Sequence, residues 1–227
     1  GDVANAGVRA DFVTTAVRTG GPGYGGVSLL VVDKDTPGFS VDRSLTKMGW
    51  HCSDTAELSY VDVRVPASHL VGEENTGFFQ IADAFVIERL ALAAHGYGIA
   101  SRCVELAAAY AKDRETFGRP LVANQVVRHK LVDMHRRVDV ARTYTRDVAR
   151  RHVAGENVLA EALHAKATAV ECAEHVVHQA VQLFGGTGYM HGTEVERHYR
   201  DARILGIGGG ATEVLNDLNA RLLGFTP

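Results

Sequence analysis

The sequence predicts an α+β protein in which a small antiparallel β domain precedes a longer helical bundle. The first seventy or so residues hold short β-branched and aromatic runs separated by turn residues, a pattern typical of strands. After Gly77 the apolar residues recur at spacings of three, four and seven, which is the period of an amphipathic helix. We therefore expect a partial β domain at 1–73 and a helical-bundle domain at 74–227.

Three runs in the first region predict strands. Phe12–Val17 is β-branched and aromatic, Val27–Val32 is a short apolar run, and Leu58–Val65 alternates before Pro66. The glycine-rich stretch Gly21–Gly26 precedes a strand and opens no helix, so it predicts a hairpin loop and not a dinucleotide-binding loop. The first strand begins almost at residue 1 with little to pair against. We expect either that sequence in front is missing or that a partner chain supplies it.

Four apolar stripes predict the helices of an antiparallel bundle. The first follows Gly77, and the others cover Gln125–Val153, Asn157–Phe184 and Ala211–Leu223. The third stripe ends at the pair Gly185–Gly186, which suits a helix C-cap because glycine adopts the left-handed conformation that ends many helices. Long amphipathic segments with short connections favour antiparallel packing.

Composition excludes several classes of function. The net charge is −3, from 24 basic and 27 acidic side chains, whereas a dedicated nucleic-acid binder carries a basic excess. No apolar run is long enough to span a bilayer. The three cysteines form no CxxC pair and no metal-ligand spacing, which favours a reducing compartment and no metal site. The Ala-, Arg- and Gly-rich composition favours a bacterial cytoplasm, with the mitochondrial matrix as the alternative.

Glu88 is the candidate for chemistry. It follows Ile81 by seven residues and Phe85 by three, which places it within roughly 20° of Ile81 on the same apolar stripe. A buried carboxylate is costly unless paired or neutral, and desolvation favours its proton-binding form. Such a group suits a general base that removes a weakly acidic proton in a site from which water is excluded. The alternative is that Glu88 lies at the bundle edge and pairs with a Lys or Arg, and periodicity leaves both interpretations open.

Five stretches together resemble the acyl-CoA dehydrogenase family. They are KDTPGFSV (34–41), KMGWHCSDTAELSYVDVRVPASHLVGEENTGF (47–78), ERLALAA (88–94), RETFGRPLVANQ (114–125) and QLFGGTGYMHGTEVERHYRDARILGIGGGATEV (182–214). Their order and spacing match the family across nearly the whole chain. The resemblance implies an N-terminal helical domain, a middle β domain and a C-terminal four-helix bundle, of which the first and the start of the second are absent here.

The resemblance also implies an activity and its partners. The cofactor would be FAD, the substrate an acyl-CoA thioester, and the reaction an α,β-dehydrogenation in fatty-acid or branched-chain acyl catabolism, as in β-oxidation. A carboxylate would remove the α proton while the β hydrogen leaves as a hydride to the flavin. Electrons would pass to an electron-transfer flavoprotein, and the assembly would be a homotetramer built as a dimer of dimers.

The position of the base distinguishes branches of this family. Most members carry it in a Tyr-Glu-Gly-Thr segment after an RDA-type motif, and aligning Arg200–Ala202 places Gly209 at the usual base. A minority, including isovaleryl-CoA and long-chain acyl-CoA dehydrogenases, carry the glutamate on the first bundle helix in an ERL context. The resemblance therefore assigns the base to Glu88. It assigns the Gly209 N–H to the thioester oxygen, with a flavin ribityl hydroxyl as the second donor.

The resemblance places four further residues at the substrate. Arg89 would help to hold it, or else be a surface helix charge, and Leu92 resembles a pocket-lining position one turn beyond the base. Gly208 and Gly210 would flank the Gly209 donor. Because Gly208 stands where straight-chain relatives carry a bulky Tyr, we expect an isovaleryl-like or longer 3-methyl-branched acyl-CoA. Long straight chains are the second choice.

Three motifs resemble FAD contacts. The first resembles residues that reach the FAD of a neighbouring subunit and comprises Arg114, Glu115, Thr116, Phe117 and Gln125. Its arginine suits a pyrophosphate, which it can hold with two donors. The second resembles an adenine-side contact, or is a simple helix C-cap, and comprises Gln182, Leu183, Phe184, Gly185 and Gly186. Thr212 and Glu213 resemble the last contact, although Ala211 replaces the usual Thr there.

Two other functions stay open from the sequence. A non-catalytic subunit could complete a partner's FAD site by donating Arg114 and Gln182. A flavin monooxygenase or oxidase on the same fold is the other, and Glu88 in its ERL context disfavours it.

Overall fold

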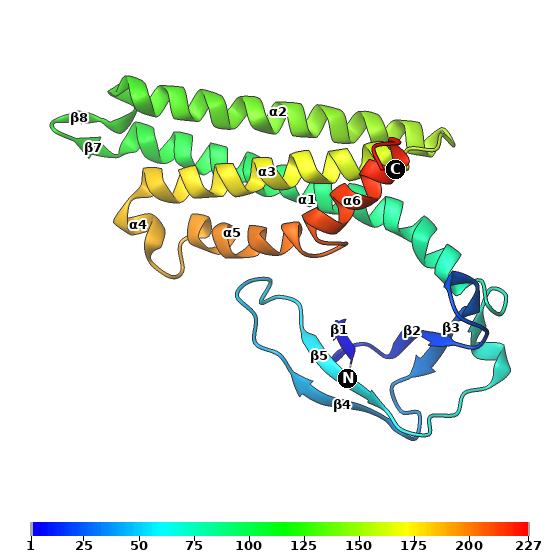
Figure 1. Cartoon of the computed structure of the whole chain (residues 1–227). Coiled ribbons are helices and arrows are strands. Elements are labelled where there is room, and N and C mark those ends of the chain that lie inside the picture. Colours follow the sequence, from blue (N-terminus) through cyan, green and yellow to red (C-terminus); the bar gives the residue numbers. More distant parts are fainter. Residues whose placement is uncertain (1, 227) are drawn as a thin grey trace. The chain divides into compact units, whose positions relative to one another are not determined.

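The computed structural model describes residues 2–226 and divides the chain into two compact units, Gly1–Ala84 and Phe85–Pro227. The first unit consists of antiparallel strands and the second of helices, so the predicted α+β class is confirmed (Figure 1). The units meet inside the long helix α1 (Gly77–Asp113). The domain boundary between 73 and 74 stays a prediction.

The first unit contains two three-stranded antiparallel sheets, ordered β1-β5-β4 and β2-β3-β6. The strands are β1 Asp2–Asn5, β2 Phe12–Arg18, β3 Val27–Asp33, β4 Phe39–Ser44, β5 Thr55–Tyr60 and β6 Leu70–Val71. β2 and β3 pair from Phe12 opposite Asp33 to Arg18 opposite Val27. The loop Gly21–Gly26 therefore closes a hairpin, as its sequence predicts.

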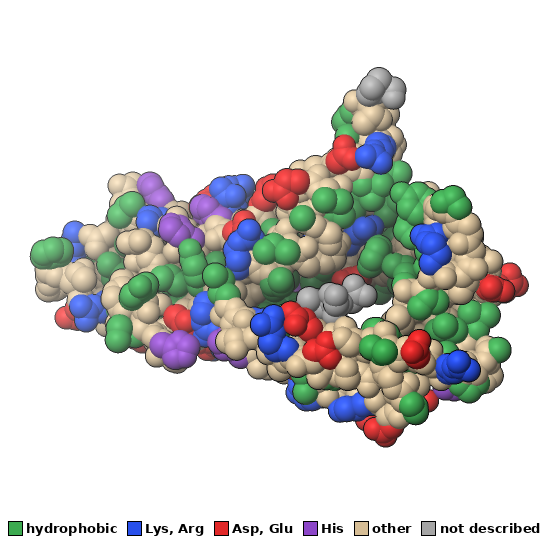
Figure 2. All heavy atoms as spheres, turned by 60° about the horizontal axis from the view of Figure 1, so that its bottom comes forward, with side chains coloured by type: hydrophobic (Ala, Val, Ile, Leu, Met, Phe, Trp, Pro, Cys, Tyr) green, Lys and Arg blue, Asp and Glu red, His purple; other side chains and the backbone are tan. Residues whose placement is uncertain are grey.

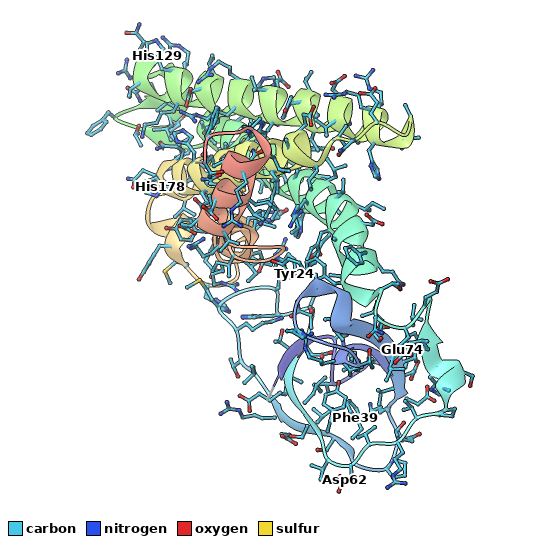
Figure 3. All side chains as sticks on the ribbon, turned by 45° about the vertical axis from the view of Figure 1, so that its right-hand side comes forward. Tyr24, Phe39, Asp62, Glu74, His129 and His178 are labelled. Carbon is cyan, nitrogen blue, oxygen red and sulfur yellow. The ribbon has the colours of Figure 1, made fainter. Side chains whose placement is uncertain are left out.

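The strand predicted over Leu58–Val65 is only partly correct. β5 begins earlier, at Thr55, and ends at Tyr60, because the chain turns at Asp62, whose φ of 51° breaks the extended conformation (Figure 3). Strands β1, β4 and β6 are additional to the prediction. β6 has two residues, and β4 alternates apolar and polar residues only over Phe39–Asp42 before ending in the polar pair Arg43–Ser44. β6 therefore falls short of the about four to eight residues that mark a strand, and the alternation in β4 reaches only the lower limit.

The first turn of α1 belongs to the β unit. A Cβ atom at Gly77 would lie 2.8 Å from the backbone carbon of Ser28, so only glycine lets the helix start this close to β3. Tyr24, from the β2–β3 loop, stacks on Phe78 with ring centroids 4.2 Å apart (Figure 3). These contacts explain why the first unit extends into α1.

The second unit is a bundle built on three long helices (Figure 1). Its helices are α1 Gly77–Asp113, α2 Gln125–Val153, α3 Leu159–Phe184, α4 Gly186–Tyr189, α5 Glu194–Ala202 and α6 Thr212–Leu222. A hairpin of β7 (Glu115–Thr116) and β8 (Arg119–Pro120) joins α1 to α2. Short 3-10 segments cover Tyr24–Gly26, Ala67–His69, Leu121–Ala123 and Arg203–Gly206. The predicted helices are confirmed, with α2 at its predicted bounds, and only α4 and α5 are new.

Small residues let α1 and α3 approach closely. A Cβ atom on Gly96 would lie 3.0 Å from the carbonyl oxygen of Ala169, so these two helices are in backbone contact there. The buried positions of α1 beyond that point are mostly alanine or cysteine, namely Ala100, Cys103, Ala107 and Ala111. Gly185 is the C-cap residue of α3, as predicted, although its φ of 58° and ψ of −138° lie outside the left-handed helical region and suit glycine for that reason.

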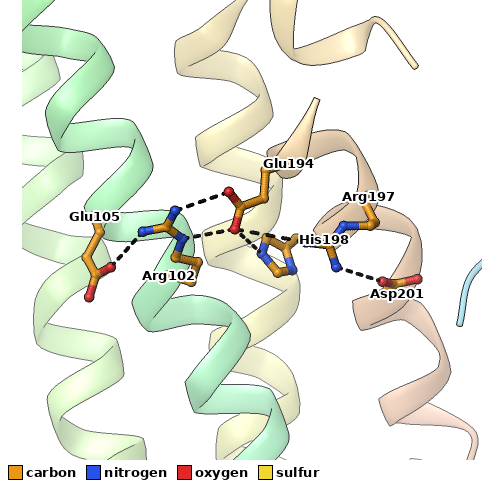
Figure 4. Close-up of polar contacts among 6 residues, drawn as sticks. All are labelled: Arg102, Glu105, Glu194, Arg197, His198 and Asp201. Atoms are coloured by element: carbon orange, nitrogen blue, oxygen red, sulfur yellow. Dashed lines mark hydrogen bonds and ion pairs between the residues drawn. The ribbon is translucent and has the colours of Figure 1, made fainter. Parts of the chain in front are cut away.

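An ion-pair network attaches α5 to α1. Arg102 of α1 holds Glu194 of α5 through Nε to Oε1 at 2.9 Å and Nη2 to Oε2 at 3.2 Å (Figure 4). Glu105 accepts a third bond from the same guanidinium at 3.2 Å, and His198 Nε2 lies 3.3 Å from Glu194 Oε1. This two-bond geometry is the strong form of an Arg–carboxylate pair.

None of the helices among residues 2–226 is long and apolar enough to cross a membrane. Within the same residues, no three His, Cys, Asp or Glu side chains gather in a way that could hold a metal ion. On the face drawn in Figure 2, basic and acidic side chains are interspersed with hydrophobic ones.

Candidate active site

Glu88 of α1 meets the glycine loop, which we define as residues 208–210 between the last 3-10 segment and α6. A Cβ atom built on Gly209 would lie 3.5 Å from Glu88 Oε1 and 2.5 Å from Leu92 Cδ1. Gly209 has φ +64°, a conformation that favours glycine. The structure thus brings together the predicted base, the predicted thioester-oxygen donor and the predicted pocket residue Leu92.

The expected burial of Glu88 is wrong. Glu88 is exposed, and the buried row of α1 runs instead through its neighbour Arg89 and then Ala93. The side of α1 that we expected to be buried was inferred from Ile81 and Phe85. Phe85 is itself 36% exposed. The face of a helix that packs depends on what surrounds it, so a one-residue error turns the stripe by about 100°. No described residue forms a salt bridge with Glu88, so the alternative of an edge ion pair is not seen either.

Arg89 is buried beneath this site, which excludes the alternative of a surface charge. It is 7% exposed, and its guanidinium carbon lies 5.2 Å from the centroid of the Phe85 ring, a cation–π contact. Its Nε has no hydrogen-bond partner among the described residues. Burial lowers the pKa of Arg89, and the negative charge of Glu88 opposes that shift. Its substrate-holding role stays a prediction.

Lys166, in the N-terminal third of α3, contacts this site although the sequence did not predict it. It is 1% exposed, and its Nζ donates to the carbonyl oxygens of Gly208 at 2.5 Å and Gly210 at 2.6 Å. Burial lowers the pKa of Lys166, the positive charge of Arg89 lowers it further, and the negative charge of Glu88 opposes both. The available signal was a lysine within an alanine-rich, buried stripe of α3. From sequence alone, such a lysine is interpreted as an exposed residue at the border of the polar face of the helix. Only its hydrogen-bond partners show that it is buried.

The first two cofactor motifs come together at one end of the bundle. Arg114–Phe117 lie in and beside the β7–β8 hairpin, Gln125 starts α2, and Gln182–Gly186 end α3 and start α4. Tyr110, near the end of α1, stacks on Phe184 with centroids 4.1 Å apart, and its hydroxyl donates to the Phe184 carbonyl at 3.4 Å. We call this set of residues the hairpin end.

The third cofactor motif lies elsewhere. Thr212 and Glu213 begin α6, and Thr212 lines the same small cavity as Lys166. The distance along α3 from Lys166 to Gln182 is about 24 Å at 1.5 Å per residue. Within one chain the predicted FAD residues therefore form two separate groups, one at the hairpin end and one beside the glycine loop.

A cavity at the hairpin end adds residues that the sequence did not indicate. It has a volume of about 560 Å³ and lies between α3 and the α4–α5 region. Gln182 is the one predicted site residue in its lining, which also includes His178 (Figure 3), Tyr189, Tyr199 and Arg200. Tyr189, Tyr199 and Arg200 lie in the family-like stretch 182–214 but received no role from the sequence, and His178 belongs to no motif, so only their placement in the fold brings them to this cavity.

The sequence profile described as "Acyl-CoA dehydrogenase, C-terminal domain" matches residues 75–224. The chain belongs to the acyl-CoA dehydrogenase family. It is similar to an acyl-CoA dehydrogenase of Bacillus subtilis (strain 168), with 38% identity over 212 residues that make up 93% of this chain and 56% of that protein. The family resemblance in the sequence is thereby confirmed.

Solved structures agree with this acyl-CoA dehydrogenase assignment. The crystal structure of a putative acyl-CoA dehydrogenase from Mycobacterium smegmatis is 62% identical with a TM-score of 0.97, covering 98% of this chain and 59% of that one. The FAD complex of PigA is 26% identical with a TM-score of 0.92, covering 97% and 58%. The chain spans little more than half the length of these relatives.

Proposed function

We propose that the protein dehydrogenates an acyl-CoA thioester between Cα and Cβ in an FAD-dependent reaction, with Glu88 as the base. The observation that carries this proposal is the 3.5 Å separation between Glu88 Oε1 and a Cβ position at Gly209. A carboxylate and a backbone N–H on either side of one thioester suit removal of the α proton while charge develops on the carbonyl oxygen. Membership of the acyl-CoA dehydrogenase family supports it.

The residues of this chain divide the work in the proposed reaction. Glu88 takes the α proton, and the electron pair of the broken C–H bond enters the new Cα–Cβ double bond. The Gly209 N–H, which donates to no described atom, is available to the thioester oxygen and would stabilise its enolate-like charge. FAD, when bound, would accept the β hydrogen as a hydride. We further propose an electron-transfer flavoprotein as the acceptor that reoxidises the enzyme.

The residues at the hairpin end fit FAD chemically. Arg114 is exposed and forms no salt bridge with a described residue, so its guanidinium is available to a pyrophosphate. A Cβ built on Gly185 or Gly186 would meet nothing within 4 Å, so a ligand can approach this backbone closely. Phe117 offers a completely exposed ring. Thr212 and Glu213 would serve a flavin beside the glycine loop.

We propose that the two groups of FAD residues serve two different flavins. About 24 Å of α3 separates Lys166, near the glycine loop, from Gln182 at the hairpin end. The glycine-loop group would contact the flavin of its own active site, and the hairpin end would contact the FAD of a second copy. This arrangement requires a homo-oligomer, which we propose to be a dimer of dimers.

We propose a branched acyl group as the substrate. Gly208 lacks a positive φ, and a Cβ there would meet only Ile204 O at 3.4 Å and Ile204 Cγ1 at 3.9 Å. The backbone therefore does not require glycine at 208, and the space that a bulky side chain would fill stays open one residue before Gly209, the position that borders Glu88 and Leu92. That room suits 3-methylbutyryl-CoA or longer 3-methyl-branched thioesters, and an activity profile that favours unbranched butyryl-CoA would contradict it.

The first test is anaerobic reduction of the holoenzyme by 3-methylbutyryl-CoA, followed by the loss of flavin absorbance. Wild type should bleach, and Glu88→Gln should bind FAD and ligand but bleach at least about 1000-fold more slowly, because the amide cannot accept the proton. Equal bleaching of both proteins would assign the base to another residue.

A non-catalytic subunit is the alternative function, motivated by the exposed residues at the hairpin end that resemble FAD contacts. It predicts that wild type binds FAD yet no acyl-CoA in a series of chain lengths bleaches it. Bleaching by any member of the series, lost in Glu88→Gln, would reject this alternative.

A further inference from the structure

Lys166 contacts the site through the backbone of the glycine loop. It is the largest fully buried side chain among the described residues, and both of its hydrogen-bond acceptors among them are carbonyl oxygens of this loop. No described carboxylate forms a salt bridge with it. A lysine is rarely buried without such a partner, because removing its charge from water is costly. Its placement therefore needs a reason other than bundle packing.

The two bonds fix the direction of the Gly209 N–H. In a planar trans peptide the C=O and N–H point in opposite directions. The carbonyl of Gly208 and the N–H of Gly209 belong to the same peptide unit. Because Nζ of Lys166 holds that carbonyl, the N–H must point away from α3. It donates to no described atom, so it is free to meet a ligand.

The other face of the loop is also fixed. A Cβ on Gly210 would lie 2.7 Å from Leu215 Cδ2, and one on Gly209 would lie 2.5 Å from Leu92 Cδ1. Gly209 and Gly210 have φ values of +64° and +101°, which few other residues adopt. Loops of this kind have little intrinsic rigidity, so the lysine bonds supply order that three consecutive glycines cannot.

We propose that Lys166 is the positioning residue of this active site, holding the Gly208 and Gly210 carbonyls so that the Gly209 N–H faces the thioester oxygen opposite Glu88. The inference rests on the proposed function. A buried ammonium behind the loop also places positive charge near the oxygen that becomes negative, and a preorganised charge of this kind favours the transition state over the ground state. Arg89, the neighbouring buried cation, adds to the same field.

The test separates proton removal from hydride transfer. The probe is 3,3-dimethylbutyryl-CoA, which has α protons but no β hydrogen, so the holoenzyme can exchange its α protons with D2O but cannot dehydrogenate it. Mass spectrometry of the thioester gives the exchange rate. In Lys166→Met, which keeps the side-chain length without donors or charge, we expect exchange to fall roughly 100-fold, as for loss of an oxyanion donor. Lys166→Gln keeps two N–H donors and should recover part of the rate.

Two further measurements distinguish positioning from loss of structure. Hydrogen–deuterium exchange of the backbone over residues 204–215 should become faster in Lys166→Met, while affinity for 3,3-dimethylbutyryl-CoA changes less than about threefold. The control is Thr145→Val, which removes a buried bond within α2 from Thr145 Oγ1 to Ala141 O at 2.7 Å. It should change neither the α-proton exchange nor the loop.

The possible results distinguish a failure of the proposed function from a failure of the role proposed for Lys166. Wild-type exchange that is no faster than in Glu88→Gln would overturn the proposed function and this inference with it. Wild-type exchange that depends on Glu88 but is unchanged in a folded Lys166→Met would overturn only the role of Lys166. If Lys166→Met fails to retain FAD, Lys166→Leu, which also lacks donors and charge, replaces it, and a rate within twofold of wild type in that variant would reject the inference.

Discussion

At the scale of single residues, the proposed site has a glycine where the sequence resemblance expects most family members to carry the base. Gly209 combines a positive φ with a side-chain position that Leu92 and Glu88 already border. The same residue cannot hold a carboxylate without moving Leu92, whose Cδ1 would lie 2.5 Å from the new Cβ. Glycine at 209 therefore fits beside Glu88 and Leu92, whereas a carboxylate side chain at 209 would collide with Leu92.

Gly209→Ala should destabilise the protein by about 1–2 kcal/mol, because an L-residue is strained at φ +64°. The added methyl group also displaces Leu92, so α-proton exchange should slow. Urea unfolding measures the first effect. Gly208→Ala is the control for stability alone, since Gly208 has no positive φ and its Cβ would meet Ile204 O at an ordinary 3.4 Å. Equal midpoints for the two variants would contradict the prediction.

The sequence was sufficient to place Glu88 and Gly209 together but not to describe their surroundings. Both residues were found by motif, and the structure brings them into contact. The exposure of Glu88 could not be predicted, because the packed face of α1 depends on the elements around it, such as α3 at Gly96 and α5 at Arg102, and not on the local apolar stripe alone. The role of Lys166 was not predicted for a similar reason. Its partners are backbone carbonyls, and every residue has one, so the sequence does not indicate which ones a lysine will contact.

At the scale of elements, long helices were predictable and short ones were not. α2 has a continuous apolar stripe over its full length, and the structure gives it the predicted bounds. α5 has only a narrow buried face, made of Val195, His198 and Ala202, among charged residues. Its position depends on tertiary contacts, above all the Arg102–Glu194 pair (Figure 4).

That pair makes the attachment of α5 sensitive to acid. Hydrogen bonds from Arg102 lower the pKa of Glu194 from its usual 4.5 to about 2. A carboxyl group whose pKa is lowered on folding contributes stability above its unfolded pKa. Wild type should therefore lose this contribution as the pH falls from about 4.5 toward 2. Because the Glu194 side chain is 36% exposed, solvent screening limits the effect to about 1 kcal/mol.

The measurement is the free energy of urea unfolding at pH 6 and pH 3.5 in wild type and Glu194→Gln. The difference between the two proteins should be largest at pH 6 and should shrink at pH 3.5, because other carboxylates titrate equally in both. Glu105→Gln is the matched control, since it removes the more exposed acceptor of the same guanidinium, 64% exposed. A pH-independent difference between wild type and Glu194→Gln would contradict the assignment.

At the scale of the whole molecule, the hairpin end presents residues that nothing in the chain itself explains. Phe117 is completely exposed and has φ +52°, and Gly118 follows with φ +74°, which together form a two-residue hairpin turn. A phenylalanine in this conformation is strained, and exposure gives it no compensating burial. Such a residue points to a contact outside the chain, which we propose to be the FAD of a second copy.

Phe117→Asn tests this role by separating stability from cofactor binding. Asparagine adopts positive φ more readily than phenylalanine, so the free energy of unfolding should stay equal or rise slightly. FAD retention should fall several-fold. It is measured as the flavin-to-protein absorbance ratio after gel filtration, and light scattering gives the mass of the assembly in the same run. The control is Val153→Ala at the opposite end of α2, about 42 Å away along the helix and 86% exposed. Full FAD retention in Phe117→Asn, with an assembly of wild-type mass, would mean that the hairpin end contacts no flavin and that its strain has another cause.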